Sequence, residues 1–220
     1  MQPSLSLATA AADLLLGATC PGCAAPSRTV CGACLRALAP APRAVLEDPV
    51  PVVAAGAHAG TLREVVIAWK EHGRRGLTPV LAHLAAAAVV SLVDGAPSVQ
   101  LVPVPTSRRS RRARGTDVVA DLATSTARLL GDVGLDCTTR GLLRMRRQTR
   151  DQADLGALER AENLAGAFVA DPAGPTAGAS HPVVVLDDVV TTGATLAESV
   201  RALHAADHHV VGAVTVCSRD

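Results

Sequence analysis

Two neighbouring carboxylates and a run of hydroxyls stand together late in the chain. Asp187 and Asp188 follow the apolar stretch 183–186, and residues 191–195 come next. This last stretch places three threonine hydroxyls and backbone N–H groups at an expected helix start, where the dipole and the unpaired donors both favour phosphate. Its glycine, Gly193, permits a tight turn and a close approach to the backbone. The segment therefore predicts a phosphate-binding loop formed by Thr191, Thr192, Gly193, Ala194 and Thr195.

The two carboxylates need a different ligand, because both would repel a phosphate. Asp187 and Asp188 are suited to hold ribose hydroxyls and, directly or through water, Mg²⁺. The structural alternative is a capped helix start in which aspartate and threonine are ordinary turn residues. A complete hydrophobic strand, two aspartates and a Thr-Thr-Gly-Ala-Thr run occur together here. That combination favours the ligand site.

Four of the six cysteines form two Cys-x-x-Cys pairs near the N-terminus. Each pair can form a tight turn that points two thiolates at one ion, and two such turns give the tetrahedral four-sulfur shell that structural zinc prefers. In a reducing compartment, paired motifs of this kind indicate a metal rather than disulfides. We expect Cys137 and Cys217 to be packing residues. The predicted ligands of a structural zinc site are Cys20, Cys23, Cys31 and Cys34.

Positive charge is concentrated in the middle of the chain. Residues 107–150 contain eleven arginines and four aspartates, a local net charge of +7, whereas the whole chain carries +1. This asymmetry predicts that the segment faces an anion, either phosphate groups or a nucleic-acid backbone. The alternative is that many of these arginines are solvated and reflect the overall composition. Aromatic rings are nearly absent, with Trp69, Phe168 and no tyrosine, so base stacking on single-stranded nucleic acid has little support.

Strands and helices alternate after residue 50, which predicts an α/β domain with a mainly parallel sheet of the Rossmann-like type. The continuous aliphatic run at 183–186, three valines and a leucine, is typical of a buried parallel strand. Strands are expected at residues 50–57, 99–104, 183–186 and 210–216. Helices are expected at residues 61–71, 77–93, 112–131 and 194–206, where apolar residues recur at helical spacing.

The N-terminal part is expected to form a separate small module. Four prolines between residues 40 and 51 indicate a linker, so we expect a helix and the zinc module in residues 1–45 and the α/β domain in residues 46–220. Residues 14–20 loosely imitate a lipoprotein cleavage site, but Asp13 interrupts the apolar run and no Lys or Arg precedes it. No window of about 20 residues is apolar without a break. These features predict a cytoplasmic protein without membrane insertion.

Residues 183–196 resemble the phosphoribosyl pyrophosphate (PRPP) binding motif of type I phosphoribosyltransferases. Further motifs, in the same order along the chain, are similar to those of the ComF family, bacterial proteins linked to competence. They are the double Cys-x-x-Cys module, Trp69-Lys70, residues 102–105, Arg114-Gly115, and the spaced residues from Thr149 to Phe168. The likeness covers nearly the whole chain. It departs at Thr116 and Asp117, where the family usually has an aromatic residue and Asn, and it lacks the usual aromatic residue near His58.

The resemblance implies that PRPP lies across the carboxyl ends of the parallel strands. Residues 191–195 would hold its 5′-phosphate, and Asp187 and Asp188 its ribose. Displacement of pyrophosphate at the anomeric carbon would need Mg²⁺ and cations to stabilise the departing charge. The arginine-rich stretch 144–150 would sit in a loop that closes over the substrate. The pyrophosphate would meet Thr106, Ser107 and Arg108, with loop contacts from Lys70, Arg114, Gln152 and Arg160.

Alternatives remain open for the loop contacts and for the function. Lys70 is equally well interpreted as a surface lysine beside Trp69, and Arg160 as a structural partner on a helix. One function class is a PRPP-dependent transferase with an unknown acceptor. The other is a PRPP or nucleotide sensor, or an adaptor in DNA uptake, whose arginine-rich segment and zinc module contact nucleic acid or a partner protein. Formation of a homo-oligomer is compatible with both classes.

Overall fold

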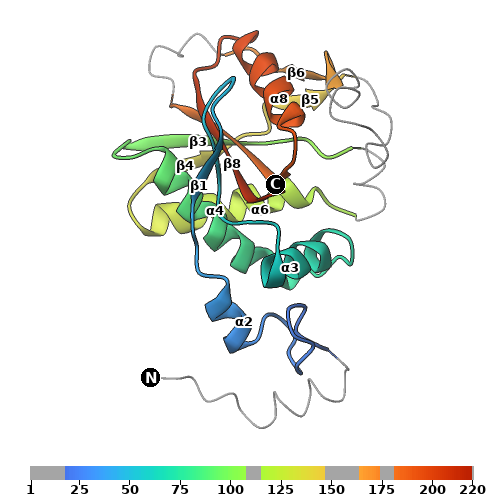
Figure 1. Cartoon of the computed structure of the whole chain (residues 1–220). Helices are drawn as coiled ribbons and strands as arrows, with labels where there is room; N and C mark the ends of the chain where they lie inside the picture. Colours follow the sequence, from blue (N-terminus) through green and yellow to red (C-terminus); the bar gives the residue numbers. More distant parts are fainter. Residues whose placement is uncertain (1–17, 108–114, 147–163, 174–180, 220) are drawn as a thin grey trace.

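The centre of the molecule is a six-stranded sheet (Figure 1). The computed structural model describes residues 18–107, 115–146, 164–173 and 181–219. The strand order is β1-β2-β8-β7-β3-β4, and every neighbouring pair is parallel except β1 with β2. The strands are β1 (Arg43–Leu46), β2 (Val52–Ala54), β3 (Ser98–Pro103), β4 (Asp136–Thr139), β7 (Val183–Val190) and β8 (Val210–Ser218). The predicted mainly parallel α/β fold is confirmed.

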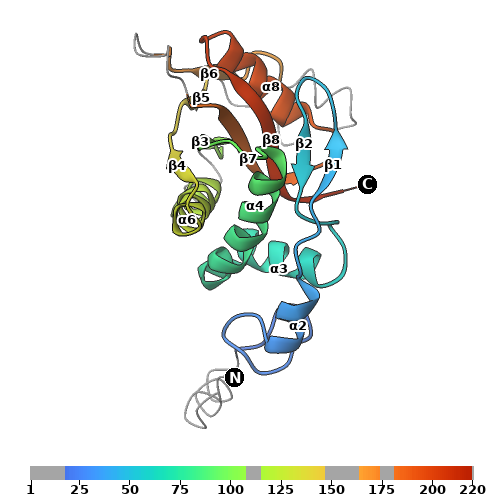
Figure 2. The ribbon, with the colours of Figure 1, turned by 90° about the vertical axis from the view of Figure 1, so that its left-hand side faces the viewer.

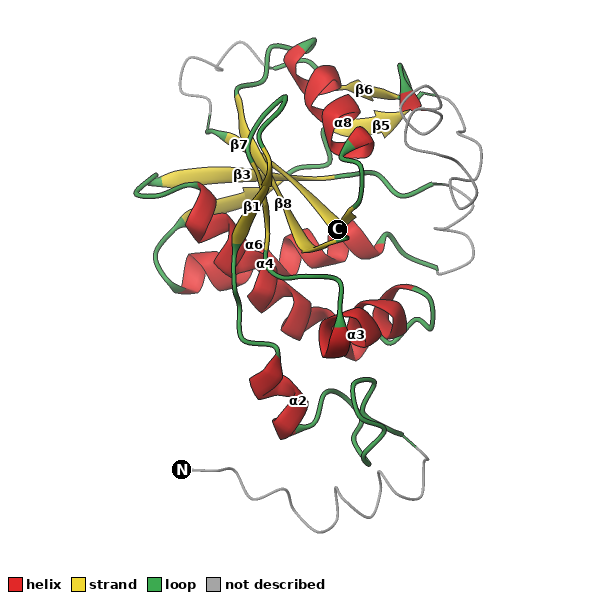
Figure 3. Ribbon diagram, viewed as in Figure 1, coloured by secondary structure: helices red, strands yellow, loops and turns green. Residues whose placement is uncertain are grey.

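Helices cover both faces of this sheet, which makes three layers (Figures 2 and 3). One face carries α4 (Thr78–Leu92) and α6 (Val118–Asp132), which pack against each other, with α3 (Gly60–Lys70) beside them. The other face carries α8 (Ala194–His204) and a two-stranded ribbon of β5 (Leu143–Met145) and β6 (Phe168–Ala170). A sheet covered on both faces explains why its central strands are mostly apolar.

Alternate residues of β7 belong to the hydrophobic cores on the two faces of the sheet. Val184 and Leu186 belong to the core beneath α4 and α6, whereas Val183 and Val185 belong to the core beneath α8. This alternation is the two-residue period of a strand. The strand continues past the expected end at residue 186 and includes Asp187 and Asp188, because its pairing with β8 extends to Val190 and Ser218.

Several short elements do not follow from the sequence pattern. Strand β1 lies in the proline-rich stretch that was expected to be a linker, and it spans the expected boundary between residues 45 and 46. The division into residues 1–45 and 46–220 stays a prediction. Strands β4, β5 and β6 have three or four residues each, too few to display a period. A short helix, α2 (Gly32–Ala37), carries the second pair of cysteines.

One helical stretch bears on the expectation of no membrane insertion. By length and composition, Arg75–Leu92 is apolar enough to cross a membrane, which the sequence analysis did not anticipate. This stretch consists of the 3-10 turn η1 (Arg75–Leu77) and α4. The α4 side chains Leu81, Ala85 and Ala88 are completely buried in the core. That burial is typical of a core helix that lies between a sheet and its neighbours.

Candidate functional site

The connections that leave the adjacent strands β3 and β7 lead to opposite sides of the sheet. From β3 the chain passes through α6 to β4 at one edge, and from β7 it passes through α8 to β8 on the opposite side. Connections that diverge in this way leave a crevice outside the carboxyl ends of the two strands, and open α/β sheets bind ligands there. The loops at this crevice are residues 104–107 after β3 and residues 191–193 after β7.

Asp187 and Asp188 lie near the carboxyl end of β7. The Asp188 side chain is 5% exposed, and its Oδ2 lies 2.5 Å from Nζ of Lys70, the last residue of α3. Its other oxygen accepts a hydrogen bond from the Val189 amide at 2.9 Å. The Asp188 amide in turn donates to Oδ1 of the half-buried Asp187 at 2.8 Å. Lys70 is therefore the direct counter-ion of a site carboxylate, and it is not an isolated surface lysine.

Lys70 gives the two carboxylates different proton affinities. Burial and the neighbouring charge of Asp188 raise the pKa of Asp187 well above its ordinary value. Burial also acts to raise the pKa of Asp188, but the Lys70 charge and the hydrogen bonds to Lys70 and Asp187 outweigh it and leave that pKa lowered. The pKa of Lys70 is raised despite its burial, since both aspartates favour its charged form. The site thus holds one firmly ionised carboxylate beside one that binds a proton readily.

The loop after β7 has the conformation that the sequence predicts. Gly193 has φ +77° and stands immediately before α8. A Cβ at this position would lie 2.5 Å from Cδ1 of Leu46 in β1, so both the backbone angle and the available space require glycine. Thr191 and Thr192 are exposed, and the first turn of α8 contains no acidic residue. The Ala194 amide lies 3.5 Å from the Thr192 hydroxyl, and the N–H groups of a first helical turn, which have no partner within the helix, can receive an anion.

The turn after β3 is held by Asp117. The Thr106 hydroxyl donates to Oδ1 of Asp117, and the Thr106 amide approaches Oδ2 at 3.4 Å. The same aspartate caps α6 by accepting from the Ala120 amide at 3.3 Å. Asp117 entered the sequence analysis only as a departure from a family pattern, and no sequence signal linked it to Thr106. Ser107 follows in the same turn and is half-buried.

The remaining predicted loop contacts are only partly described. Arg108, Arg114, Gln152 and Arg160 lie outside the described residues. Of the arginine-rich stretch 144–150, residues 144–146 are described. Arg144 lies in β5 and forms an exposed ion pair with Asp171. Buried Glu198 of α8 accepts from the Phe168 amide at 3.3 Å and thereby ties the β5–β6 ribbon to the site helix.

A cavity of about 300 Å³ adjoins the loop after β7. Its lining includes Thr191, together with Arg43 from β1 and Arg219, the residue after β8. Neither arginine was singled out from the sequence. They are far apart along the chain and come together only in the fold, where Arg43 Nη2 donates to Oγ of Ser218, the last residue of β8.

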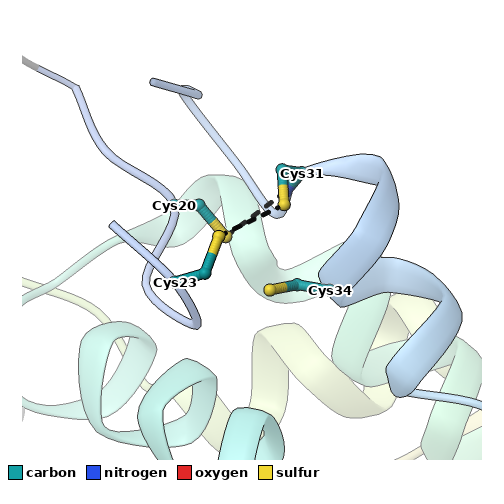
Figure 4. A group of neighbouring side chains, drawn as sticks. All are labelled: Cys20, Cys23, Cys31 and Cys34. Atoms are coloured by element: carbon teal, nitrogen blue, oxygen red, sulfur yellow. Dashed lines mark hydrogen bonds between the residues drawn. The ribbon is translucent and has the colours of Figure 1, made fainter. Parts of the chain in front are cut away.

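The four predicted metal ligands form one cluster (Figure 4). The Sγ atoms of Cys20, Cys23, Cys31 and Cys34 all lie within 4.8 Å of one another, and none of these residues is in a disulfide. Cys23 Sγ and Cys31 Sγ are 3.5 Å apart. Tetrahedral zinc with bonds of about 2.3 Å needs sulfurs about 3.8 Å apart, so the cluster fits such an ion closely. Cys217 is fully buried and Cys137 packs against the core.

Local hydrogen bonds favour the thiolate form of Cys20, one of the four cysteines. Burial acts to raise the pKa of Cys20, but amide donors from Cys31, Gly22 and Cys23 outweigh it and lower the pKa to about 6. The thiolate form, which is the form that binds metals, is therefore favoured at neutral pH. The Cys31 amide lies 3.4 Å from Cys20 Sγ.

The cysteine module is docked on the segment that carries Lys70. A Cβ on Gly22 would lie 2.8 Å from Cγ2 of Thr61 in α3, so the module and the helix are in close contact. The Arg74 guanidinium, just after α3, donates to the carbonyls of Thr19 at 2.7 Å and Arg28 at 3.0 Å. Helix α3 thus connects the cysteine cluster to the Asp188 carboxylate.

Comparison with known proteins supports the interpretation of this crevice. Residues 120–220, just under half of the chain, match the family model of the phosphoribosyl transferase domain. The match begins within α6 and includes β7, α8 and β8, but not Lys70, the turn after β3 or the four cysteines. No curated protein matches the chain. The mainly parallel α/β fold therefore carries a phosphoribosyl transferase domain, with a four-cysteine cluster near the N-terminus.

Proposed function

We propose that this chain is a PRPP-dependent phosphoribosyltransferase of the ComF type. The observation that carries the proposal is the end of β7: two adjacent carboxylates stand at the crevice and are followed by a glycine turn that opens α8. Carboxylates suit ribose hydroxyls, and exposed N–H groups at a helix start suit a phosphate. A sugar phosphate has both groups a few ångströms apart.

Each part of PRPP has a suitable partner in this arrangement. Residues 191–195 bind the 5′-phosphate, and Asp187 and Asp188 bind the ribose hydroxyls. Thr106 and Ser107 follow the strand next to β7 and bind the pyrophosphate, together with Arg108, the next residue in the sequence. The remaining loop contacts are Lys70, Arg114, Gln152 and Arg160. The reaction displaces pyrophosphate from the anomeric carbon by an acceptor, and it needs no covalent nucleophile from the protein.

Two metals accompany this proposal. Asp187 and Asp188 offer the carboxylate oxygens that Mg²⁺ prefers, directly or through water. Bound Mg²⁺ would neutralise the charge that develops on the departing pyrophosphate. The four cysteine sulfurs would hold Zn²⁺ in a closed shell, which gives that ion a structural role.

Calorimetric titration of PRPP with Mg²⁺ tests the proposal. We expect binding to the unaltered protein and loss of binding in the Asp187→Asn/Asp188→Asn variant. Asp132→Asn, at the exposed end of α6, is the control for charge removal. Because Asp188 is buried against Lys70, the Asp187→Asn single variant is titrated as well, and circular dichroism reports whether each variant is folded. A folded, unaltered protein that binds no PRPP contradicts the proposal.

The second candidate function is a non-catalytic PRPP or nucleotide sensor, or an adaptor in competence-type DNA uptake. The charge distribution favours it: residues 107–150 carry a local net charge of +7. In that case the segment binds a nucleic-acid backbone or an acidic partner protein. Pyrophosphate release on addition of candidate acceptors separates the two classes, because an adaptor releases none.

A further inference from the structure

We propose that metal binding by the four cysteines and PRPP binding at the crevice strengthen each other, and that Arg74 couples the two. This inference rests on the proposed function, since it concerns regulation of the same site. Helix α3 and the turn after it lie next to the cysteine module (residues 18–38) and also carry Lys70 (Figures 1 and 2). Arg74 acts on the ligand through Lys70 and is therefore a positioning residue.

Arg74 closes the end of α3 and holds the cysteine module with different groups of the same residue. Its amide donates to the Ala68 carbonyl at 3.1 Å, which folds the chain back on the last turn of α3. Its guanidinium donates to the carbonyls of Thr19 at 2.7 Å and Arg28 at 3.0 Å. Thr19 immediately precedes Cys20, and Arg28 lies between the two Cys-x-x-Cys pairs. The fold of the module therefore determines where the helix ends.

The start of α3 and its buried face contact the module as well. A Cβ on Gly22, in the first Cys-x-x-Cys turn, would lie 2.8 Å from Cγ2 of Thr61 in α3 and 2.9 Å from Sγ of Cys34. The turn and the helix thus leave no room for a methyl group between them. Cys20 and Cys34 also belong to the same hydrophobic core cluster as Trp69 of α3. A module that opens without its metal loses contacts along the whole helix.

A displacement of α3 reaches the crevice because Lys70 is its last residue. Lys70 Nζ lies 2.5 Å from Oδ2 of Asp188, whose side chain is 5% exposed. Water screens a buried pair only weakly, so the interaction energy responds strongly to the position of the ammonium group. Asp188 is proposed to bind the ribose hydroxyls and Lys70 to contact PRPP. Both contacts therefore weaken when the end of α3 moves.

The coupling must act in both directions. If metal in the module places Lys70 for PRPP, then PRPP at the crevice holds α3, and with it the module, in the arrangement that binds metal. The two affinities change by the same factor, because the two binding equilibria form one thermodynamic cycle. We expect a factor of about ten, which lies within the usual range for coupled sites.

Calorimetric titration of PRPP with Mg²⁺ into zinc-loaded and zinc-free protein measures one direction of the coupling. We expect the zinc-loaded protein to bind PRPP about tenfold more tightly. Arg74→Gln keeps all four cysteines and should still bind Zn²⁺, but its PRPP affinity should equal that of the zinc-free protein with or without the metal. Arg63→Gln is the matched control, because Arg63 is exposed on the same helix and pairs with Glu64. It should keep the full factor.

The reverse direction is measured on folded, zinc-loaded protein, so that it does not depend on the zinc-free form. A chromophoric chelator competes for Zn²⁺, with Mg²⁺ in excess to saturate PRPP. We expect PRPP to raise the zinc affinity about tenfold in the unaltered protein and in Arg63→Gln, but not in Arg74→Gln. Circular dichroism reports whether each form is folded.

The outcomes separate the coupling from the proposed function. If PRPP binds equally well with and without Zn²⁺ and leaves the zinc affinity unchanged, the coupling is wrong and the proposed function stands. If Arg74→Gln is less stable but keeps the ratio of affinities, Arg74 is only a structural residue and its assignment is overturned. If a folded protein binds no PRPP in either form, the proposed function has failed and the coupling fails with it. A protein that binds PRPP but takes up no Zn²⁺ overturns the coupling alone.

Discussion

The ion pair between Lys70 and Asp188 determines the electrostatics of the candidate site. Asp188 is held ionised in a buried position, and its charge makes Asp187 retain a proton more strongly. Two adjacent carboxylates whose pKa values are shifted in opposite directions are typical of functional sites. The lysine therefore positions Asp188, in addition to the contact with PRPP proposed for it.

Removal of the Lys70 charge should destabilise the protein at neutral pH. In Lys70→Met, Asp188 stays buried without its partner, and we expect the free energy of unfolding at pH 7 to fall by about 2 kcal/mol. That value is below the range for a fully buried pair, because the Lys70 side chain is 32% exposed. Urea unfolding measures the change, and Lys70→Arg is the control that keeps the positive charge.

The stability of Lys70→Met should also depend on pH differently from that of the unaltered protein. The folded-state pKa of Asp188 lies below its ordinary value of 3.8, so the pair stabilises the protein above pH 3.8 and this contribution is lost as the pH falls through the folded pKa. Without Lys70, burial raises the pKa of Asp188. The difference in stability between Lys70→Met and the unaltered protein should therefore begin to shrink above pH 3.8 and be smallest once the pH is below the lowered folded-state pKa of the unaltered protein. A difference that stays constant down to the acid transition would contradict the assignment of Lys70 as the partner of Asp188.

Gly193 offers a second test at the residue scale. Gly193→Ala places a Cβ at φ +77° and 2.5 Å from Leu46, so we expect a loss of about 2 kcal/mol in unfolding free energy. Gly134→Ala is the matched control, because Gly134 has φ +89° with nothing within 4 Å and suffers the backbone strain alone. Thermal unfolding should rank Gly193→Ala below Gly134→Ala, and equal losses would mean that Leu46 moves aside without cost.

The sequence predicts features that lie within one element, but it does not predict the contacts between elements. Strand β7 and helix α8 follow from a continuous aliphatic run, a glycine turn and a helical period, all of which are local signals. The contacts of Lys70 with Asp188 and of Thr106 with Asp117 join separate elements, so no local pattern contains them. Strand β1 was missed because prolines flank a stretch too short to show a period, and its pairing with β2 alone makes it a strand.

Helix α3 connects the cysteine cluster with Asp188, two sites that lie far apart in the sequence. It contacts the cysteine module through Thr61, carries the buried Trp69, and ends at Lys70. Trp69 Nε1 donates to the Thr78 hydroxyl at 3.0 Å, within the core cluster that also contains Cys20 and Cys34. A change in the cysteine module should therefore reach Trp69, which is the only tryptophan of the chain.

Removal of metal should consequently alter tryptophan emission. After metal analysis has established the zinc content, we expect a chelator to shift the emission of Trp69 to longer wavelength and to lower the midpoint of thermal unfolding, because the module loosens from α3. Cys23→Ser, which removes an exposed cysteine of the cluster, should already have the shifted emission and should not respond to the chelator. Unchanged emission in a protein that has lost its zinc would show that the module and α3 are not coupled.

The whole molecule combines a crevice with converging polar groups and a strongly positive middle segment. A transferase would use the polar groups of the crevice, whereas a nucleic-acid adaptor would use the arginines of residues 107–150. A closed substrate site relies on a few short contacts, whereas a nucleic-acid surface relies on many arginines and on the release of counterions. Their responses to salt must therefore differ, whatever the acceptor is.

Salt dependence is the prediction that separates the classes at this scale. Between 50 and 200 mM KCl, we expect the affinity for PRPP with Mg²⁺ to change by less than about tenfold. Any binding of duplex DNA through six or more of the arginines in residues 107–150 should weaken by about a thousandfold or more over the same range. Calorimetry for PRPP and fluorescence anisotropy for DNA measure the two. If DNA binding with this steep salt dependence were found while PRPP binding was absent, the adaptor function would be favoured, because the charge of that segment would then serve a surface and not the crevice.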